Sequence, residues 1–444
     1  MSAAKNDLIL VLNCGSSSIK FALYDAAMQP LPRASLGACR PLGVDSENAP
    51  QRGQFLPDSQ PTIPKSDRLL WSGKVDGITG AHPQWSESSQ EAPQPLALDA
   101  KAPYHAALEH IRARVRAFVA QHCAGRGIGV VAHRVVHGGS KYLAPVRMDA
   151  AVLADLRSYI PLAPLHQPFA LEAIAVLLEA RPELPQVAVF DTAFHHTLPE
   201  VEKMLPLPYS AWERGVRRYG FHGLSYEYQS LALAERYGAA ARGRTIVAHL
   251  GSGASLCAMQ DLRSVATTMG FSALDGLMMG TRCGALDPGA LLYLMEIEKR
   301  TLAEVGHMLY HECGLLGVSG VSADPRELLP LEAGNPRVQA ALALYVRRIV
   351  REIGALVAVL GGLDMLVFTA GIGEHNDTLR ARVCEGLGFL GVALDAAANA
   401  RHAPCISSAA SRVRVAVEPT NEEWIAAWHA ARLLRDSAPE TQTL

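Results

Sequence analysis

The chain has few cysteines for its length and almost no net charge. Eight cysteines are scattered over 444 residues, and none forms a Cys-x-x-Cys pair. This usage argues against a disulfide framework and indicates reduced, mostly buried thiols in a cytoplasmic protein. The formal net charge of −2 gives no global electrostatic reason to expect nucleic acid or a membrane surface as a partner.

Long apolar runs are also missing. The longest candidate for a membrane span, 353–368, is broken by Gly361, Gly362 and Asp364, and we interpret it as a buried helix, a turn and a strand. The first residues lack the basic, apolar and cleavage regions of a signal peptide. No GxxxxGK[ST] motif occurs, which argues against a P-loop kinase. With 49% hydrophobic residues, the chain is expected to form two or three globular domains in the cytoplasm.

Two glycine-rich hairpins of one design are the most informative feature that is present. The first covers 8–23 and turns at Gly15, and the second covers 245–257 and turns at Gly251. Such turns expose successive backbone N–H groups that suit a phosphate. One copy is weak evidence, because Gly and Ser are ordinary turn residues. The repetition after about half the chain predicts a duplicated domain that holds a nucleotide between its halves.

Strands and helices alternate along most of the remaining sequence. This alternation predicts an α/β fold with central sheets. The expected elements are a helix over 104–123, a strand over 128–132, a helix over 169–179, a strand over 187–190, a helix over 335–360, strands over 365–369 and 413–417, and a C-terminal helix.

The stretch 29–103 differs from the rest in composition. It carries 11 of the 27 prolines together with many Ser and Gln residues, so no long helix is expected there. Trp71 and the neighbouring Leu69 and Leu70 indicate that part of it packs as short strands. We expect an exposed, partly flexible insertion in the first domain.

Eight short motifs occur in the order found in acetate kinases. Any one of them would be weak evidence, whereas eight in order are specific, and the chain resembles that family nearly throughout, except in 29–103. The motifs are Asn-Cys-Gly-Ser-Ser-Ser at 13–18 with Lys20, His-Arg-Val-Val-His-Gly-Gly at 133–139, Phe-Asp-Thr-Ala-Phe-His at 190–195, Arg-Tyr-Gly-Phe-His-Gly at 218–223, His-Leu-Gly at 249–251, Gly-Thr-Arg at 280–282, Gly-Ile-Gly-Glu at 371–374 and Thr-Asn-Glu-Glu at 420–423.

The resemblance implies a fold and an activity. The fold would be two duplicated ribonuclease-H-like domains around an ATP cleft, as in the actin-like ATPase superfamily. The first domain would span 1–192 and be joined by the C-terminal helix 424–444, and the second would span 193–423. The implied activity is reversible, direct in-line phosphoryl transfer from ATP to acetate, giving acetyl phosphate and ADP. Mg²⁺ is the implied metal, with Mn²⁺ as an alternative, and the implied assembly is a homodimer.

Other functions remain open at this stage. A propionate or other short-chain acyl kinase of the same family is the nearest alternative. A chaperone-like or actin-like ATPase would keep the glycine turns but has no reason to keep Arg134, His222 and Arg282 together. A binding protein with decayed catalysis would have lost Asp191, Arg282 or Glu422, and all three are present.

The chemistry of the reaction favours arginines in the site. An acceptor carboxylate with a pKa of about 4.3 is already ionised at neutral pH, so no general base is required. The difficulty is that an anion must approach an anion, and a guanidinium fork matches both carboxylate and phosphoryl oxygens. By resemblance, Arg134 binds the acyl substrate and Arg282 stabilises the transition state. Without the resemblance, a loop arginine is more simply interpreted as a solvated charge.

The resemblance also assigns roles to residues near the arginines. Asp191 is the catalytic aspartate, for which we prefer positioning of metal or water to proton abstraction. Asn13 and Glu422 are the Mg²⁺-associated residues, although Glu422 also suits a helix cap. His222 is the transition-state histidine, and His166 is a second active-site histidine with a structural alternative. Three further histidines lack metal-ligand spacing and are expected to be structural: His137, His195 and His196.

Two sets of binding residues complete the predicted site. The acyl pocket corresponds to Val136, Leu165, Phe221 and Ala273, beside Arg134 and His166. The nucleotide would contact Lys20, His249, Leu250, Gly251, Ser252, Gly253, Asp324, Pro325, Arg326, Gly371, Ile372, Gly373, Glu374 and His375.

The chain departs from the family pattern at four of these positions. Ser252 and His375 replace the usual asparagines, and Pro325 replaces a bulkier residue, so the purine preference stays open. Ala273 replaces the usual proline of a Gly-Phe-x-Pro-Leu loop. Because alanine is smaller, we expect the pocket wall to recede and propionate to be used within about tenfold of acetate.

Overall fold

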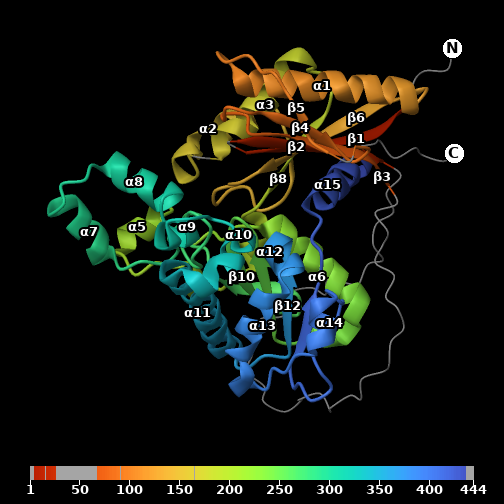
Figure 1. Cartoon of the computed structure of the whole chain (residues 1–444). Coiled ribbons are helices and arrows are strands. Elements are labelled where there is room, and N and C mark those ends of the chain that lie inside the picture. Colours follow the sequence, from red (N-terminus) through yellow and green to blue (C-terminus); the bar gives the residue numbers. More distant parts are fainter. Residues whose placement is uncertain (1–4, 16, 27–67, 91, 165, 437–444) are drawn as a thin grey trace.

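The computed structural model describes residues 5–15, 17–26, 68–90, 92–164 and 166–436. Within these residues the strands form two mixed sheets, which lie in the two halves of the molecule (Figure 1). The strand order is β5-β4-β3-β2-β1-β6-β8-β7 in the first sheet and β11-β10-β9-β12-β13 in the second. The mixed α/β fold with two sheets confirms the predicted fold class.

The first sheet is built around the first glycine hairpin. β1 pairs antiparallel with β2 and parallel with β6, and β6 pairs parallel with β8. The carboxyl ends of β1, β6 and β8 therefore meet at one edge of the sheet. The strands are β1 Lys5–Cys14, β2 Ser18–Asp25, β3 Leu69–Asp76, β4 Gln84–Glu87, β5 Gln94–Pro95, β6 Arg126–Val135, β7 Val146–Arg147 and β8 Gln186–Phe190.

The second sheet repeats this arrangement around the second hairpin. β9 pairs antiparallel with β10 and parallel with β12, and β12 pairs parallel with β13. The order β10-β9-β12 thus matches β2-β1-β6, as the repeated hairpins predicted. The strands are β9 Thr245–Leu250, β10 Ala254–Gln260, β11 Arg263–Thr267, β12 Met365–Thr369 and β13 Arg414–Val417.

Helices cover both faces of the first sheet. Side chains alternate along β1, so that Leu10 packs in the cluster that contains residues of α1 (Pro103–His122) and α3 (Gln167–Ala180). The next residue, Val11, packs on the opposite face against α15 (Glu422–Asp436). Figure 1 shows α1 and α15 on opposite sides of this sheet. The C-terminal helix therefore packs on the first sheet, while the domain boundaries at 192 and 423 stay predictions.

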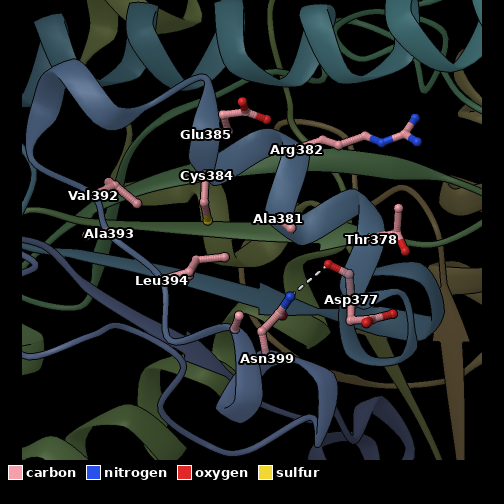
Figure 2. Close-up of a pocket in the computed structure, with 11 residues that line it drawn as sticks. Asp377, Thr378, Ala381, Arg382, Cys384, Glu385, Val392, Ala393, Leu394 and Asn399 are labelled. Atoms are coloured by element: carbon pink, nitrogen blue, oxygen red, sulfur yellow. Dashed lines mark hydrogen bonds between the residues drawn. The ribbon is translucent and has the colours of Figure 1, made fainter.

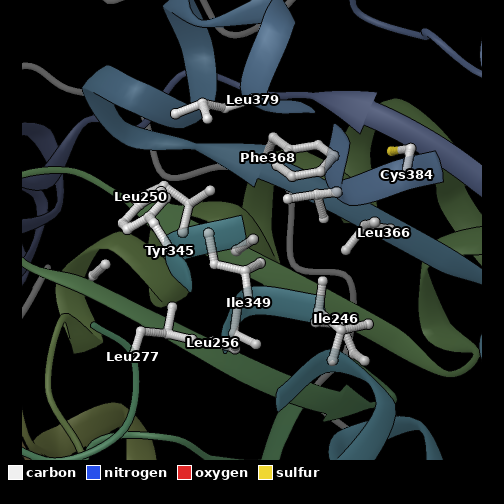
Figure 3. Close-up of a cluster of buried hydrophobic side chains, with 14 of the residues drawn as sticks. Ile246, Leu250, Leu256, Leu277, Tyr345, Ile349, Leu366, Phe368, Leu379 and Cys384 are labelled. Carbon is white, nitrogen blue, oxygen red and sulfur yellow. The ribbon is translucent and has the colours of Figure 1, made fainter. Parts of the chain in front are cut away.

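The long helix α11 (Pro336–Leu360) forms much of the second core. Asn335 caps its first turn, and Gly361 with φ of 70° follows its end. Apolar residues recur every three or four positions along it, so one face is buried. Tyr345 and Ile349 of this face pack with Ile246, Leu256 and other strand residues (Figure 3).

The remaining helices are short. The α-helices are α2 Ala150–Ser158, α4 Glu200–Lys203, α5 Tyr209–Glu213, α6 Gly223–Tyr237, α7 Pro288–Glu296, α8 Leu302–His311, α9 Gly314–Ser319, α10 Pro325–Leu328, α12 Ala370–His375, α13 Asp377–Glu385 and α14 Ala396–Ala400. The 3₁₀ helices are η1 Ile160–Leu162, η2 Ala193–Thr197, η3 Gly238–Arg242, η4 Leu329–Gly334 and η5 Gly388–Leu390.

The proline-rich stretch 29–103 is only partly described, since 27–67 lie outside the described residues. Its later part forms β3, β4 and β5, which extend the first sheet beyond β2. Trp71 and Trp85 are 3% and 4% exposed and contact the ring of Phe21. The short strands expected around Trp71 are therefore present, and the two tryptophans complete the core beneath α1. The stretch is not exposed throughout, although Leu69 and Leu70 are each 38% exposed.

The apolar run 353–368 divides as the sequence indicated. Its first part ends α11, Gly361 and Gly362 turn the chain, and its last part forms the buried strand β12. Across the described ranges of the chain, no helix has the length and apolar character of a membrane span.

Candidate active site

A cavity of about 620 Å³ is lined by residues from both sheets. It lies at the edge where β1, β6 and β8 end in one sheet and β9 and β12 end in the other. The predicted site residues that line it are Asn13, Lys20, Arg134, Val136, His166, Asp191, Phe221, His222, His249, Gly251, Ser252, Gly253, Ala273, Arg282, Gly371, Glu374 and Glu422.

The other predicted nucleotide residues do not line this cavity. Leu250 is buried, and Asp324 caps the start of α10 while pairing with the exposed Arg326 at 2.6 Å. Leu165 lies outside the described residues. Those absent from the lining are Leu250, Asp324, Pro325, Arg326, Ile372, Gly373 and His375, and their nucleotide contacts stay predictions.

Arg134 is the centre of a charge cluster in this cavity. Its Nε and Nη2 donate to the carboxylate of Asp191 at 3.0 and 2.7 Å. Its Nη1 lies 3.0 Å from Oε2 of Glu422 and 3.5 Å from Oδ1 of Asn13. The guanidinium of Arg134, which we expected to bind the acyl substrate, is thus paired with Asp191 and Glu422 in this structure.

Sheet register brings three of these four residues together, and helix α15 adds Glu422. Asn13 on β1 is directly opposite Arg134 on β6, and Asp191 directly follows the end of β8. Glu422 begins α15, where a carboxylate interacts favourably with the helix dipole. The side chain of Asn421, not that of Glu422, accepts from the backbone N–H of Trp424 at 2.9 Å. Asn421 is therefore the residue whose side chain caps α15, and Glu422 contributes only its charge at the start of the helix.

Burial and pairing act in opposite directions on this cluster. Burial, with Glu422 adding to it, raises the pKa of Asp191 above its ordinary value, although the charge and hydrogen bonds of Arg134 oppose this rise. Burial alone would lower the pKa of Arg134, but Asp191 and Glu422 raise it above its ordinary value. The guanidinium therefore stays charged, and its three hydrogen bonds favour the ionised form of Asp191.

Three histidines at the cavity are held in the neutral form. Burial lowers the pKa of His222 well below its ordinary value, with His249 adding to the effect. Burial, helped by Arg134, lowers the pKa of His249 to about 3. Burial, helped by Arg282 and Arg134, lowers the pKa of His166 to about 4. The rings of His222 and His249 stack with centroids 4.1 Å apart.

Arg282 reaches the cavity from a glycine-flanked loop between Gly280 and Gly284. Its Nη1 donates to the carbonyl of Ala273 at 2.9 Å. A Cβ placed on Gly253 would lie 3.2 Å from Nη2 of Arg282 and 3.2 Å from Nε2 of His222. No carboxylate among the described residues forms an ion pair with this arginine. Arg282 therefore presents a positive charge beside the second glycine turn.

The oxygen donors around Arg134 suit a magnesium ion. Asp191 and Glu422 supply carboxylates, and Asn13 supplies an amide oxygen. Mg²⁺ prefers such ligands and usually takes only one or two from the protein, the rest being water and phosphate oxygens. In the described part of the chain, no group of three or more His, Cys, Asp or Glu residues is arranged to hold a metal. The residues fit a metal that binds together with a phosphate.

A second cavity, of about 630 Å³, lies between α13 and residues 392–399 (Figure 2). Asn399 of α14 donates there to the backbone carbonyl of Asp377, and Arg382 pairs with Glu332 at 2.7 Å. None of the predicted site residues lines this second cavity.

A model of the acetokinase family matches residues 58–428. An acetate kinase from Rhodopseudomonas palustris is 45% identical over 431 residues, which cover 96% of this chain and 98% of that protein. The chain belongs to the acetokinase family. This result confirms the resemblance inferred from the eight motifs.

Solved structures of acetokinase relatives share the fold over nearly the whole chain. A propionate kinase from Francisella tularensis superposes with a TM-score of 0.80 at 31% identity, covering 96% of this chain and 99% of that one. An acetate kinase from Porphyromonas gingivalis superposes with a TM-score of 0.76 at 34% identity, covering 96% of this chain and all of that one.

Some residues that line the cavity were not singled out from the sequence. Met269 lines the cavity together with Ala273 and Phe221. The one feature of the sequence that could have indicated its role is its position just before the Gly270-Phe271 loop. Ser18 and Thr420 lie within the quoted motifs but were given no role. None of the three histidines expected to be structural lines the cavity: His137, His195 and His196.

Proposed function

We propose that this chain transfers the γ-phosphoryl group of ATP to acetate and reverses the reaction from acetyl phosphate and ADP. The observation that carries the proposal is the convergence of Arg134, Asp191, His222 and Arg282 on one cavity that also contains both glycine turns. The names of the relatives, acetate kinases and a propionate kinase, support the same chemistry. Direct in-line transfer requires charge stabilisation and positioning rather than a covalent intermediate.

We assign charge neutralisation to the two arginines. Arg282, which has no carboxylate partner among the described residues, lies beside Gly253, where phosphoryl oxygens meet backbone N–H groups. Arg134 keeps Nε and Nη2 on Asp191. Its Nη1, which points toward Glu422 and Asn13, is the group we assign to the acyl carboxylate.

We assign Mg²⁺, with Mn²⁺ as an alternative, to the oxygens of Asn13, Asp191 and Glu422. When bound, the ion would neutralise charge on the β- and γ-phosphate oxygens of ATP. Asp191 itself orients Arg134 through three hydrogen bonds. Because the acceptor is already ionised, we give Asp191 no role in proton abstraction.

A second candidate function is phosphorylation of propionate and other short carboxylates. The cavity wall near the acyl site contains Val136, Phe221, Met269 and Ala273. Ala273 stands where acetate kinases usually have proline, and a propionate kinase is among the similar structures. One extra methylene in such a pocket is worth about 1–3 kcal/mol of discrimination.

Trapping of the acyl phosphate with hydroxylamine tests both functions. The purified protein is incubated with ATP, Mg²⁺ and acetate, propionate or butyrate, and acyl hydroxamate is measured. We expect hydroxamate from acetate, and from propionate at a kcat/KM within about tenfold of that for acetate. Failure to form acetyl hydroxamate would contradict the proposal, and higher kcat/KM for propionate would favour the second function.

We also propose that the chain acts as a homodimer in the cytoplasm, paired through its second half. Helix α7 buries none of its own residues. Leu292, Tyr293, Ile297 and Leu302 of this region are between 55% and 75% exposed, and apolar surface of this kind marks interfaces. Light scattering should give twice the mass of one chain, and Leu292→Asp should shift it toward one. A monomeric wild type at micromolar concentration would contradict this proposal.

A further inference from the structure

His222 and His249 each bind a buried serine through one ring nitrogen. Nδ1 of His222 lies 2.8 Å from Oγ of Ser255, and Nδ1 of His249 lies 2.8 Å from Oγ of Ser225. Both serine side chains are completely buried. The Nε2 atoms lie toward the glycine turn of the cavity: that of His222 is 3.2 Å from a Cβ placed on Gly253, and that of His249 is 3.9 Å from a Cβ placed on Gly251. The serines therefore decide which ring nitrogen carries the hydrogen atom.

Each serine is in turn bound by a second hydroxyl. The hydroxyl of Tyr226 lies 2.5 Å from Oγ of Ser255, and Oγ1 of Thr420 donates to Oγ of Ser225 at 2.9 Å. Tyr226 is completely buried, and Ser255 is the one hydrogen-bond partner of its hydroxyl among the described residues. A buried O–H without an acceptor costs about 1–3 kcal/mol. Tyr226 therefore donates to Ser255.

The direction of this bond determines the state of His222. Ser255 accepts from Tyr226 and has one hydrogen of its own, which it donates to Nδ1 of His222. A neutral imidazole whose Nδ1 accepts carries its hydrogen on Nε2. The reverse order, from His222 to Ser255 to Tyr226, would leave the tyrosine hydrogen without an acceptor. Every hydrogen of this network has an acceptor only when Tyr226 donates to Ser255 and Ser255 donates to His222.

The surroundings of Nε2 agree with a hydrogen at that atom. Nε2 of His222 and Nη2 of Arg282 both approach the space over Gly253, each 3.2 Å from a Cβ placed there. No hydrogen bond joins the two side chains in the described structure, so neither group is occupied by the other. Two donors facing one space beside a phosphate-binding turn suit an oxygen anion.

We propose that Tyr226 and Ser255 are positioning residues that hold His222 as the neutral Nε2–H tautomer, so that it donates, together with Arg282, to the transferring phosphoryl group. This inference rests on the proposed function. Thr420 and Ser225 hold His249 in the same tautomer. Because neither histidine is charged, the pair adds hydrogen-bond donors to the site without adding a cation beside the two arginines.

Nitrogen-15 spectra of the histidine-labelled protein test the tautomer without any assay of activity. The His222 signals, assigned by their loss in His222→Gln, should show a protonated Nε2 and an unprotonated Nδ1 at neutral pH. Ser255→Ala should abolish this single state and give a mixture of tautomers. A protonated Nδ1 or an imidazolium in the wild type would overturn the inference, whether or not the protein phosphorylates acetate.

Kinetics of matched serine variants test the positioning role. In Ser255→Ala, kcat for acetyl phosphate formation should fall by about tenfold or more, with little change in the KM for ATP. Ser255→Thr, which keeps a hydroxyl, should recover most of the loss. Ser264→Ala is the control, because Ser264 is equally buried on the neighbouring strand and binds His195, whose ring does not line the cavity. Equal losses in both alanine variants, or no loss in Ser255→Ala, would overturn the role.

Discussion

Replacing Arg282 with lysine removes the guanidinium fork while keeping one positive charge. In the structure, Nη1 donates to the carbonyl of Ala273, and Nη2 reaches toward the space over Gly253. A lysine has one nitrogen and cannot hold the carbonyl and the phosphoryl oxygens in the same geometry. The loss of such a transition-state contact typically costs on the order of 10²–10³ in rate, or about 3–4 kcal/mol.

The variant should also become sensitive to alkaline pH. Burial lowers the pKa of Arg282, with Tyr310 opposing this, and the same burial would lower the pKa of a lysine from its ordinary value of about 10.4. The charged form is the active one, and a lowered pKa means that it is present at low pH and lost as the pH rises. The residual activity of Arg282→Lys should therefore decline at high pH more steeply than that of the wild type.

Hydroxamate formation from acetate measures both effects. The KM for ATP should change little, because the contact is expected only in the transition state. Arg382→Lys is the control, since Arg382 lines the second cavity, away from the predicted site, and forms bidentate contacts to Glu332. A kcat for Arg282→Lys within about threefold of the wild type would remove this residue from the mechanism.

Three further predictions concern the pocket, the core and the buried carboxyl group of Glu418. Ala273→Pro should shift the ratio of kcat/KM toward acetate, and a wild type that rejects propionate by about a hundredfold would contradict the wider pocket. Trp71→Ala should lower the free energy of unfolding by about 3–5 kcal/mol in denaturant titrations, and a loss below about 1 kcal/mol would show that β3 does not complete the core. Burial raises the pKa of Glu418 from 4.5 to about 7. Between pH 4.5 and about 7, the carboxyl group of Glu418 is therefore protonated in the folded state and ionised in the unfolded state. Protonation of Glu418 stabilises the folded state at low pH, and this contribution to the free energy of unfolding is lost as the pH rises through that range. Glu418→Gln should flatten the pH dependence of stability there, and an unchanged slope would contradict this.

Local sequence chemistry was sufficient to predict the two hairpins and much of the site. Gly15 and Gly251 indicate turns on local grounds alone, without knowledge of the rest of the fold. The apolar stretches on either side of them predict the paired strands. Because Asn13, Arg134 and Asp191 all stand at strand ends, the parallel order of β1, β6 and β8 brings them together. The motifs thus marked positions that the sheet topology then assembled.

The remaining features depend on contacts between distant segments. Trp71 indicated that a strand packs in this stretch, but its pairing partner was not evident from the sequence, because residues 27–67 separate β3 from β2 along the chain. The ion pair between Arg134 and Asp191 depends on the register of β6 against β8. Local sequence propensity does not determine this register. Ser255 and Tyr226 lie on a strand and a helix without a motif, and only their packing shows the link to His222.

Synthesis of ATP from ADP and acetyl phosphate is the most direct test of the proposed reaction. The purified protein is mixed with both substrates and Mg²⁺, and the ATP is measured by luciferase. Our account predicts ATP from the wild type and a rate far lower from Asp191→Asn, which leaves Arg134 without its main charge partner. No ATP above an enzyme-free control, or equal rates from the wild type and the folded variant, would contradict it.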